Sequence, residues 1–292
     1  MIWSTALKKH LKENVPLSKF TTFRIGGKAR FFIQPKNIRH LLSVLKQAHN
    51  LKVPYYILGN GSNVLVSDEG VDALVIRLSA PSFKKITFRK NIVEAGSGAH
   101  LRSLIEQAKN KGLGGCEFLS GIPATLGGAL VMNAGIKTAS IAELVEEVRV
   151  IDRKNRLRIL RNRQLKFAYR KSNLSNYVIL SVKLKLTEKP KEEITYLINS
   201  FLKKRMLSQE PVWYNAGCVF KNPPRHSAGR LIDLCGLKGK RIGDAQVSYK
   251  HANFIINRAH ATAKDVLALM DLVRNRVKDQ FGINLEPEIK IW

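Results

Sequence analysis

The sequence predicts an α+β protein that consists of two domains. Runs of apolar and β-branched residues typical of strands alternate along the chain with apolar residues at helical spacing. Glycine-rich segments follow two of the predicted strands, where a loop can approach another group closely. Around Glu188-Lys189-Pro190 the composition changes to charge and proline, as it does between domains. Because 292 residues can form two cores, we predict a first domain over 1–188, with subdomains of about 1–80 and 81–188, and a second over 189–292.

The elements are predicted from the spacing of apolar residues. The predicted strands of the first domain cover 21–25, 28–34, 53–58, 64–66, 74–78, 83–89, 91–95, 145–152, 156–160 and 176–186. Its predicted helices are a short amphipathic helix within 1–10, helices over 38–45 and 101–108, and a short helix that begins at Thr125. The second domain has predicted helices over 194–201, from Ser227, and from a capping box at Thr262 and Asp265 to Phe281, and a buried strand within 251–257.

The net charge of +28 is the most unusual property of the composition. Nucleic acid is the first partner that such a charge suggests. The stretch 153–171 is densely basic and contains no acid, and within it Arg156 and Arg158 alternate with apolar neighbours, as on a half-buried strand. Aromatic residues do not interleave with the bases to form a stacking platform. Small anionic ligands are therefore favoured and no specific nucleic acid is expected, although a secondary nucleic-acid role stays open.

Membrane insertion and secretion are not expected from this sequence. No stretch approaches the roughly 18 uninterrupted apolar residues that a membrane span requires, and the first residues lack the pattern of a signal peptide. Cys116, Cys218 and Cys235 are odd in number and lack the spacing of metal ligands. We therefore predict a reducing, cytoplasmic location and no metal site.

The loop Leu58-Gly59-Asn60-Gly61-Ser62-Asn63 follows the apolar and aromatic strand predicted over 53–58. Its two glycines let the backbone approach a ligand, and successive N–H groups in such a turn form a concave site suited to a diphosphate. A Rossmann fingerprint fits badly, because Val64 stands at the third glycine position and a strand follows in place of a helix. Taken alone, the loop is equally consistent with an ordinary tight turn.

A second glycine-rich segment extends from Cys116 to Gly135. Small residues dominate it, Pro123 sets a rigid turn, and the Gly127-Gly128 pair again permits close contact. A segment so rich in exposed backbone polar groups needs a ligand or a neighbouring chain to satisfy them. Two such loops, without a P-loop lysine or a Rossmann helix, indicate a long, flat cofactor with a diphosphate in its middle.

Four segments together resemble the FAD-binding loops of the UDP-N-acetylenolpyruvoylglucosamine reductase family: Thr22–Gly27, Leu58–Asn63, Gly121–Gly128 and Met132–Gly135. The resemblance implies a vanillyl-alcohol-oxidase-like (PCMH-type) FAD-binding fold followed by a C-terminal α+β substrate-binding domain. It extends from about Thr21 to the C-terminus. Family members usually have glycine where this chain has Ala124.

The resemblance also implies which residues bind the cofactor. The FAD-binding residues implied are Gly26, Gly27, Leu58, Gly59, Asn60, Gly61, Ser62, Asn63, Gly121, Ile122, Pro123, Thr125, Gly127, Gly128, Asn133, Ala134 and Gly135.

Three further matches to the family imply the catalytic groups. Arg170 belongs to a Tyr-Arg-x-Ser element, Cys218 stands where most members carry serine, and Glu288 is the second acid of the tail Leu285–Lys290. Without the resemblance these residues would be interpreted as a surface salt-bridge partner, a small buried residue and a solvated charge. The resemblance also implies substrate contacts by Tyr169, Lys221 and Asn222.

The family's reaction is the NADPH-dependent reduction of UDP-N-acetylglucosamine-enolpyruvate to UDP-N-acetylmuramate for peptidoglycan, with FAD as the cofactor. By this resemblance, Arg170 and Glu288 stabilise negative charge that develops on the substrate, and Cys218 protonates its carbon. Glu288 has to be protonated or lie on the far side of Arg170, since a bare carboxylate would repel that charge. The short interval from Arg170 to Cys218 lacks the segment that carries a lid tyrosine in longer members.

Two other functions stay open at this point. The first is a sugar or alcohol oxidase of the same flavin fold, although such oxidases often attach FAD to a histidine, and none occurs between Tyr55 and Asp72. The second is a basic RNA-binding protein without catalysis. The sequence predicts no oligomeric state.

Overall fold

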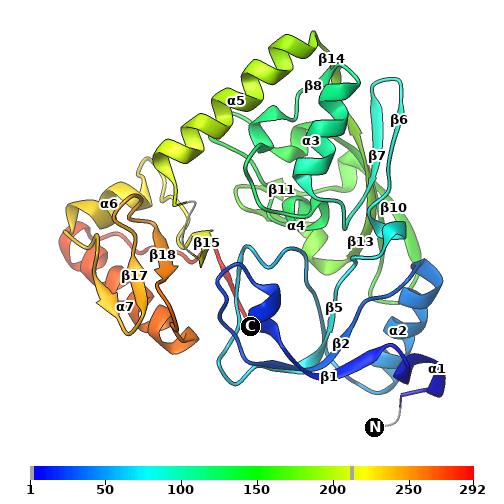
Figure 1. Cartoon of the computed structure of the whole chain (residues 1–292), viewed down its shortest axis with the longest axis horizontal. Helices are drawn as coiled ribbons and strands as arrows, with labels where there is room; N and C mark the ends of the chain where they lie inside the picture. The colour runs from blue at the N-terminus through cyan, green and yellow to red at the C-terminus, as the bar shows by residue number, and fades with distance from the viewer. Residues whose placement is uncertain (1–2, 211–213) are drawn as a thin grey trace. The chain divides into compact units, whose positions relative to one another are not determined.

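The computed structural model describes residues 3–210 and 214–292 (Figure 1). The chain forms two compact units. The first unit contains Met1–Lys12, Phe31–Gly59 and Ala73–Lys204; the second contains Glu13–Arg30, Asn60–Asp72 and Arg205–Trp292. The N-terminal helix predicted within 1–10 spans Thr5–Lys8, and Met1 and Ile2 of that prediction lie outside the described residues.

The helices and strands of the described residues have the following bounds. The α-helices are α1 (Thr5–Lys8), α2 (Ile38–Asn50), α3 (Leu101–Asn110), α4 (Leu126–Val131), α5 (Lys191–Ser208), α6 (Ala228–Leu234) and α7 (Ala263–Phe281). The strands are β1 (Leu11–Pro16), β2 (Lys28–Ile33), β3 (Tyr55–Ile57), β4 (Val64–Leu65), β5 (Val71–Ile76), β6 (Ile86–Arg89), β7 (Ile92–Gly96), β8 (Leu113–Gly114), β9 (Val145–Ile151), β10 (Leu157–Arg161), β11 (Phe167–Ala168), β12 (Lys171–Ser172), β13 (Val178–Lys185), β14 (Thr187–Glu188), β15 (Tyr214–Cys218), β16 (Arg241–Ile242), β17 (Ala245–Val247), β18 (Phe254–Asn257) and β19 (Lys290–Ile291).

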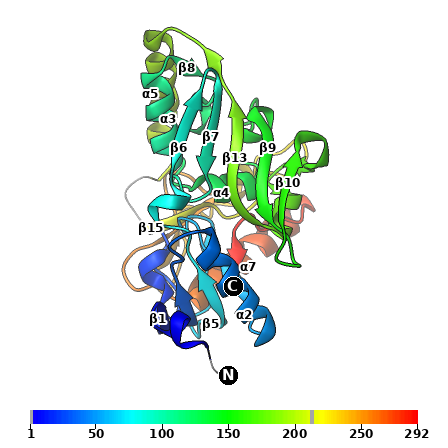
Figure 2. The same ribbon diagram turned by 90° about the vertical axis from the view of Figure 1, so that its right-hand side faces the viewer.

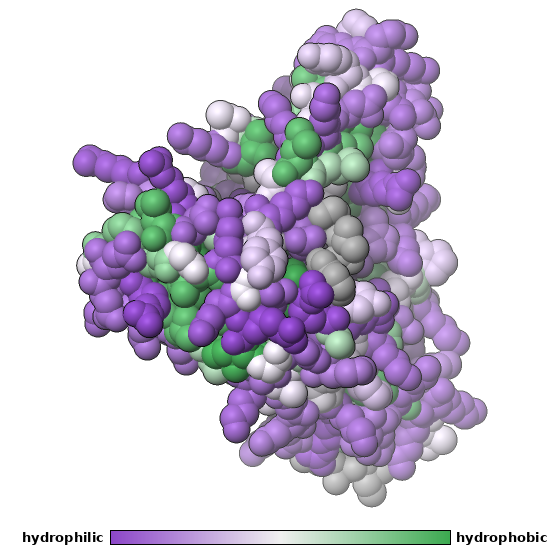
Figure 3. All heavy atoms as spheres, turned by 60° about the vertical axis from the view of Figure 1, so that its left-hand side comes forward, coloured by the Kyte–Doolittle hydropathy of each residue, from purple (hydrophilic) through white to green (hydrophobic). Residues whose placement is uncertain are grey.

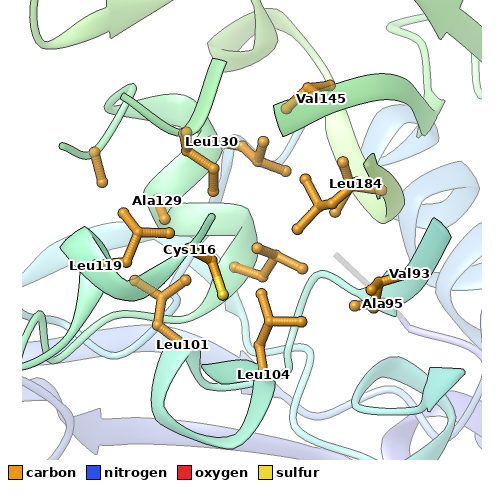
Figure 4. Packing of buried hydrophobic residues seen from close by; sticks show 14 of the residues in the cluster. Val93, Ala95, Leu101, Leu104, Cys116, Leu119, Ala129, Leu130, Val145 and Leu184 are labelled. Carbon is orange, nitrogen blue, oxygen red and sulfur yellow. The ribbon is translucent and has the colours of Figure 1, made fainter. Parts of the chain in front are cut away.

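An antiparallel sheet with the strand order β10-β9-β13-β7-β6 is the centre of the first unit (Figure 2). One of its faces packs on α3 and α4 through a core of aliphatic side chains. Figure 4 shows the Cys116 sulfur among these side chains. Burial and the neighbouring Glu117 carboxylate raise the pKa of the Cys116 thiol to about 12, so this cysteine stays protonated at neutral pH.

A further sheet has the order β1-β2-β5-β3, and α2 packs four apolar residues against its core. The strand predicted over 53–58 is β3, which is shorter and not buried: Tyr55 and Tyr56 are 38% and 36% exposed. The strand is thus confirmed over a shorter range, but the buried position expected from its apolar, aromatic residues was wrong. Such a run is also compatible with an edge strand, and among the described strands β3 pairs with β5 alone.

The strand predicted over 21–25 is also absent, and the chain forms turns there instead. Thr21 explains part of the difference, since its hydroxyl donates a hydrogen bond to the carbonyl of Ile25 at 3.0 Å and closes the segment on itself. Such local side-chain bonds offer the backbone an alternative to a sheet ladder. Lys28–Ile33 then forms β2 as predicted.

The strands predicted over 145–152 and 156–160 are confirmed as β9 and β10, which form an antiparallel hairpin, but the exposure of β10 differs from the prediction. Leu157 and Ile159, expected on a half-buried face, are 44% and 56% exposed. The hairpin turn depends on Asp152, whose carboxylate accepts hydrogen bonds from the Arg156 N–H at 2.9 Å and from the side chains of Arg156 and Arg158 at 3.1 and 3.2 Å. The acid preceding the basic stretch therefore neutralises part of it.

This turn predicts a measurable response to acid. The Arg156 N–H, followed by both arginine side chains, lowers the pKa of Asp152 from 3.8 to about 2. Because the folded-state pKa is the lower one, the stabilisation is complete above about pH 4 and is lost as the pH falls through 2. The melting temperature of the wild-type protein should therefore fall more steeply from pH 4 to pH 2 than that of Asp152→Asn. Parallel curves of melting temperature against pH would contradict this role of Asp152.

The second unit is built on the antiparallel sheet β15-β18-β17-β16, with α6 and α7 packed against its core. The capping box predicted at the start of α7 is confirmed: Thr262 accepts from the Asp265 N–H at 3.0 Å and Asp265 accepts from the Thr262 N–H at 2.9 Å. Gly282 ends the helix in the left-handed conformation, with φ +70°.

Earlier parts of the chain complete this unit. Phe23 and Leu65 belong to its hydrophobic core. Strand β4 pairs in parallel with β19, and both oxygens of Asp68 accept N–H groups at the start of α7, from Ala263 at 2.7 Å and Lys264 at 3.0 Å.

On the face that Figure 3 shows, hydrophilic side chains cover most of the surface and hydrophobic ones form smaller patches between them. Among the helices that the structure describes, none is long and apolar enough to cross a membrane.

Candidate active site

The first glycine-rich loop meets the second one at Gly59. A Cβ atom built on Gly59 would lie 2.6 Å from the Thr125 hydroxyl oxygen, so even alanine would displace this side chain. Thr125 is the N-cap of α4, as predicted, and accepts the Gly128 N–H at 3.4 Å. Within the first unit, the two glycine-rich segments predicted to bind the cofactor therefore lie in contact at Gly59 and Thr125, where one side chain is absent and the other is small.

A third segment, which the sequence analysis did not select, adjoins them. The carbonyl of Ser97 accepts the Gly127 N–H at 2.8 Å, and the carbonyl of Ala99 accepts the Leu126 N–H at 2.8 Å. The hydroxyls of Ser97 and Ser120 are buried and have no hydrogen-bond partner within the described residues. A buried hydroxyl without a hydrogen-bond partner destabilises the folded protein unless a ligand or a water molecule supplies that partner. The signal that could have revealed this segment is the Gly-Ser-Gly run directly after β7.

Arg170 lies at the turn of the short hairpin formed by β11 and β12. Its backbone is left-handed, with φ +53°, which is uncommon for a residue with a side chain. Its guanidinium donates to the carbonyl of Gly135 at 3.3 Å and lies 5.2 Å from the ring centre of Tyr169. The predicted catalytic arginine is thus held against a predicted cofactor-binding residue of the same unit.

Two further hydrogen bonds attach this hairpin to the second glycine-rich segment. The Asn133 amide donates to the carbonyl of Ala168 at 3.1 Å, and the Ser172 hydroxyl donates to the carbonyl of Leu130 at 2.9 Å. Asn133 also has a left-handed backbone, with φ +45°. Backbone angles of this kind occur in turns and cluster at active sites and ligand-binding loops, where the surrounding structure holds them.

The remainder of the Leu58–Asn63 loop belongs to the second unit. A Cβ atom on Gly61 would lie 2.1 Å from the carbonyl oxygen of Phe20, so the two backbones touch. The carbonyl of Gly61 accepts the Thr22 N–H at 3.1 Å, and the Thr22 hydroxyl donates to the carbonyl of Asn215 at 2.6 Å. Thr22 therefore links this loop to β15.

Cys218 and Glu288 lie on adjacent segments of the second unit. The Glu288 N–H donates to the carbonyl of Val219, the residue after Cys218, at 2.7 Å. The Asn63 amide donates to the carbonyl of Glu288 at 3.2 Å. A predicted cofactor-binding residue and two predicted catalytic residues, far apart in sequence, thus come together here. Cys218 is half-buried.

The two predicted substrate-binding residues after Cys218 have different surroundings. Lys221 forms an ion pair with Glu286 at 3.0 Å, which engages the first acid of the tail. The Asn222 side chain accepts the Ala228 N–H at 2.9 Å, at the start of α6. Both tail acids thus lie beside the segment after Cys218: Glu286 bonds to Lys221, and Glu288 bonds to Val219. The choice of Glu288 over Glu286 as the catalytic acid stays a prediction.

Family models match both parts of the chain: "FAD binding domain" over residues 29–161 and "UDP-N-acetylenolpyruvoylglucosamine reductase, C-terminal domain" over 209–292. The UDP-N-acetylenolpyruvoylglucosamine reductase of Moorella thermoacetica is 45% identical over 289 residues, 99% of this chain and 95% of its own length. The chain belongs to the UDP-N-acetylenolpyruvoylglucosamine reductase family.

Two more similar proteins support this membership. UDP-N-acetylenolpyruvoylglucosamine reductase 2 of Symbiobacterium thermophilum is 44% identical and covers 95% of this chain and 90% of its own length. The crystal structure of the Thermus caldophilus UDP-N-acetylenolpyruvylglucosamine reductase has a TM-score of 0.84 and 40% identity, over 97% of this chain and 99% of that chain. The predicted α+β architecture, an FAD-binding domain followed by a C-terminal domain, is therefore confirmed for this member of the reductase family.

The predicted site residues of this reductase family divide between the units. The first unit contains Leu58, Gly59, Gly121, Ile122, Pro123, Thr125, Gly127, Gly128, Asn133, Ala134, Gly135, Tyr169 and Arg170; the second contains Gly26, Gly27, Asn60, Gly61, Ser62, Asn63, Cys218, Lys221, Asn222 and Glu288. Within residues 3–210 and 214–292, no group of His, Cys, Asp and Glu side chains is arranged to hold a metal ion.

Gly61→Ala is expected to lower both FAD content and stability. The new methyl group would meet backbone atoms of Phe20 and Thr21 at a residue whose φ is +66°. Gly236→Ala is the matched control, since Gly236 has φ +68° and open space around its Cβ position. Overpacking should make Gly61→Ala less stable than the control by about 1–3 kcal/mol. Equal unfolding free energies and FAD contents in the two variants would contradict this account.

Proposed function

We propose that this chain reduces the enolpyruvyl group of UDP-N-acetylglucosamine-enolpyruvate to give UDP-N-acetylmuramate for peptidoglycan synthesis, through the residues assigned below. Membership in the reductase family makes it an oxidoreductase, and its substrate class is a UDP-sugar enolpyruvate. For the residue roles, the observation with the greatest weight is the 2.7 Å hydrogen bond that joins the Glu288 segment to the Cys218 segment.

The residues of the glycine-rich segments fit FAD. Gly59 and Gly61 have no room for a side chain, and the buried hydroxyls of Ser97 and Ser120 offer unused donors among the described residues. FAD is the cofactor of the family, and when bound it supplies the transfer of hydride from NADPH to the substrate. We propose that the cofactor-binding residues predicted from the sequence hold it, together with Ser97 and Ser120.

Cys218 is proposed as the general acid. Reduction of the double bond adds hydride to its terminal carbon and leaves an electron pair on the adjacent carbon. The Cys218 S–H bond then breaks, its proton forms the new C–H bond, and the thiolate regains a proton from solvent. A thiol with an ordinary pKa of about 8.5 is a far stronger acid than the serine hydroxyl found in most relatives.

Arg170 is proposed to bind the substrate carboxylate, into which the developing charge spreads. A guanidinium fork matches a carboxylate with two parallel hydrogen bonds, which a lysine cannot provide. Its bond to the Gly135 carbonyl and its stacking on Tyr169 orient the fork before the substrate arrives. Glu288 is proposed as the third group at the reacting centre, and Tyr169, Lys221 and Asn222 as substrate contacts.

We further propose a cofactor-binding domain over 1–188 and a substrate-binding domain over 189–292, as predicted from the sequence, with NADPH as the hydride donor and a cytoplasmic location. The compact units divide the chain differently, since 189–204 belongs to the first unit and 13–30 and 60–72 belong to the second. The family models over 29–161 and 209–292 support this order of domains. The three cysteines are free thiols, which suits a reducing compartment.

Spectroscopy of the purified protein tests the function directly. The protein should be yellow, release flavin on acid treatment, lose its visible absorbance when NADPH is added without oxygen, and regain it with the enolpyruvyl substrate. Bleaching by an alcohol or a sugar, which oxygen reverses and the enolpyruvyl substrate does not, would favour an oxidase. A colourless protein that retains nucleic acid would refute the proposal.

A further inference from the structure

Arg24 is a charged residue in a conformation that suits glycine. It lies in the Thr21–Gly27 turn with φ +58°, and its side chain is exposed. A left-handed backbone at a residue with a side chain is energetically unfavourable and persists where something else compensates for it. Glycine would adopt the same angle without this cost. The guanidinium, which glycine lacks, is therefore a candidate for a function at this position.

The contacts that Arg24 makes inside the protein are weak. Its guanidinium donates one long hydrogen bond to the carbonyl of Lys19, at 3.4 Å, and lies 5.6 Å from the ring centre of Tyr214. No ion pair to it is found in the described parts of the chain. Stacking on an aromatic ring orients a guanidinium while leaving its in-plane N–H donors available. Most donors of Arg24 are thus oriented but unused.

The surroundings of Arg24 belong to the candidate site. Thr22, two residues earlier, bonds to Gly61 of the glycine-rich loop and to Asn215 of β15. Tyr214 begins β15 and Cys218 ends it. Arg24 and Cys218 therefore lie at opposite ends of β15, and a ligand that meets both has to be extended, as a nucleotide ligand is.

We propose that Arg24, held over Tyr214, binds a phosphate group of a nucleotide ligand of this enzyme. The inference rests on the proposed function and extends it to a binding residue. Phosphate oxygens match the planar donor fork of arginine, and the charge-assisted hydrogen bonds compensate for the backbone conformation. The phosphates of the UDP-sugar, of NADPH and of FAD share this chemistry, and the experiment distinguishes these sources.

The test compares Arg24→Gly and Arg24→Lys with the wild-type protein. Arg24→Gly removes the guanidinium and favours the existing φ, so its melting temperature should be unchanged or higher. Lys90→Gly is the matched control: it also removes an exposed cation at a left-handed residue, with φ +53°, but in the turn between β6 and β7. Affinities for UDP and for 2′,5′-ADP are measured by titration calorimetry, and FAD content by absorbance.

In Arg24→Gly, loss of charge-assisted hydrogen bonds should weaken one of these ligands about 10- to 100-fold, with a smaller loss in Arg24→Lys. Weaker UDP binding identifies the substrate diphosphate, weaker 2′,5′-ADP binding identifies the NADPH phosphate, and lost FAD identifies the flavin diphosphate. Both affinities within twofold of wild type and an unchanged FAD content would overturn the inference, as would equal losses in Lys90→Gly. These readouts need no turnover, so they are independent of whether the wild-type protein reduces the enolpyruvyl substrate.

Discussion

Cys218→Ala is expected to reduce turnover of the enolpyruvyl substrate by about 10²- to 10⁴-fold, the contribution typical of a positioned general acid. The variant should still lose its flavin absorbance at the normal rate when NADPH is added, because that step takes no proton from this side chain. The half-buried thiol lies next to the Val219 carbonyl that fixes Glu288, so alanine removes the acid without breaking the backbone bond. Stopped-flow absorbance separates the two half-reactions.

Two variants control for the loss of a thiol. Cys235→Ala removes another half-buried thiol, at the end of α6, and should turn over normally. Cys218→Ser keeps a donor at the same position and should retain activity, as expected from the serine of most relatives. Normal turnover by Cys218→Ala would show that the proton has another source. Full loss in Cys218→Ser would show that thiol acidity itself is required.

Arg170→Lys is expected to lower kcat for the enolpyruvyl substrate by about 10²- to 10³-fold, similar to the loss of one preorganised donor in an oxyanion site. Lysine keeps the charge but cannot both bond the Gly135 carbonyl and present a fork to a carboxylate. Reduction of the flavin by NADPH should be unaffected. Steady-state kinetics and single-turnover bleaching measure the two effects.

The exposed Arg161 of β10 provides the control for this change, and Arg161→Lys should be indistinguishable from wild type. If Arg170→Lys raised only KM, the arginine would bind substrate and transition state equally, and its proposed role in stabilising charge would be wrong. Circular dichroism should be the same in both variants, since the hairpin is also held by Asn133 and Ser172.

Local signals in the sequence predicted local structure well. The capping box at Thr262, the short helix that begins at Thr125 and the end of the last helix at Phe281 depend on residues within a few positions of each other, and all three are confirmed. The hairpin β9-β10 and strand β2 were predictable for the same reason. Periodicity and capping chemistry determine these elements before any tertiary contact forms.

The sequence-based predictions were wrong where tertiary neighbours determine the position or exposure of a segment. Strand β3 is apolar in sequence but lies at the edge of its sheet, and Thr21–Ile25 closes on itself instead of pairing. The side chains of Leu157 and Ile159 are exposed because nothing in the local pattern says which face of a strand is covered. Strand register and edge position are properties of the whole sheet.

The candidate site was predictable only as separate pieces. Each glycine-rich segment is visible in sequence, but the contact of Gly59 with Thr125 and the bond between Glu288 and Val219 join residues far apart in the chain. Ser97 was missed because its Gly-Ser-Gly run gives an ordinary turn signal, and only its burial without a partner distinguishes it. Arg24 was missed because an arginine beside a glycine pair carries no local sign of its backbone angle.

The second unit is assembled from three stretches of polypeptide, which affects how it can be made. Its helix α7 is capped by Asp68, its core contains Phe23, and its last residue, Trp292, donates to the Leu65 carbonyl at 2.9 Å. During synthesis this unit stays incomplete until 205–292 has been made, long after its pieces 13–30 and 60–72. Such distant pairing slows folding, and a gene fragment encoding only 209–292 lacks the partners that its product needs.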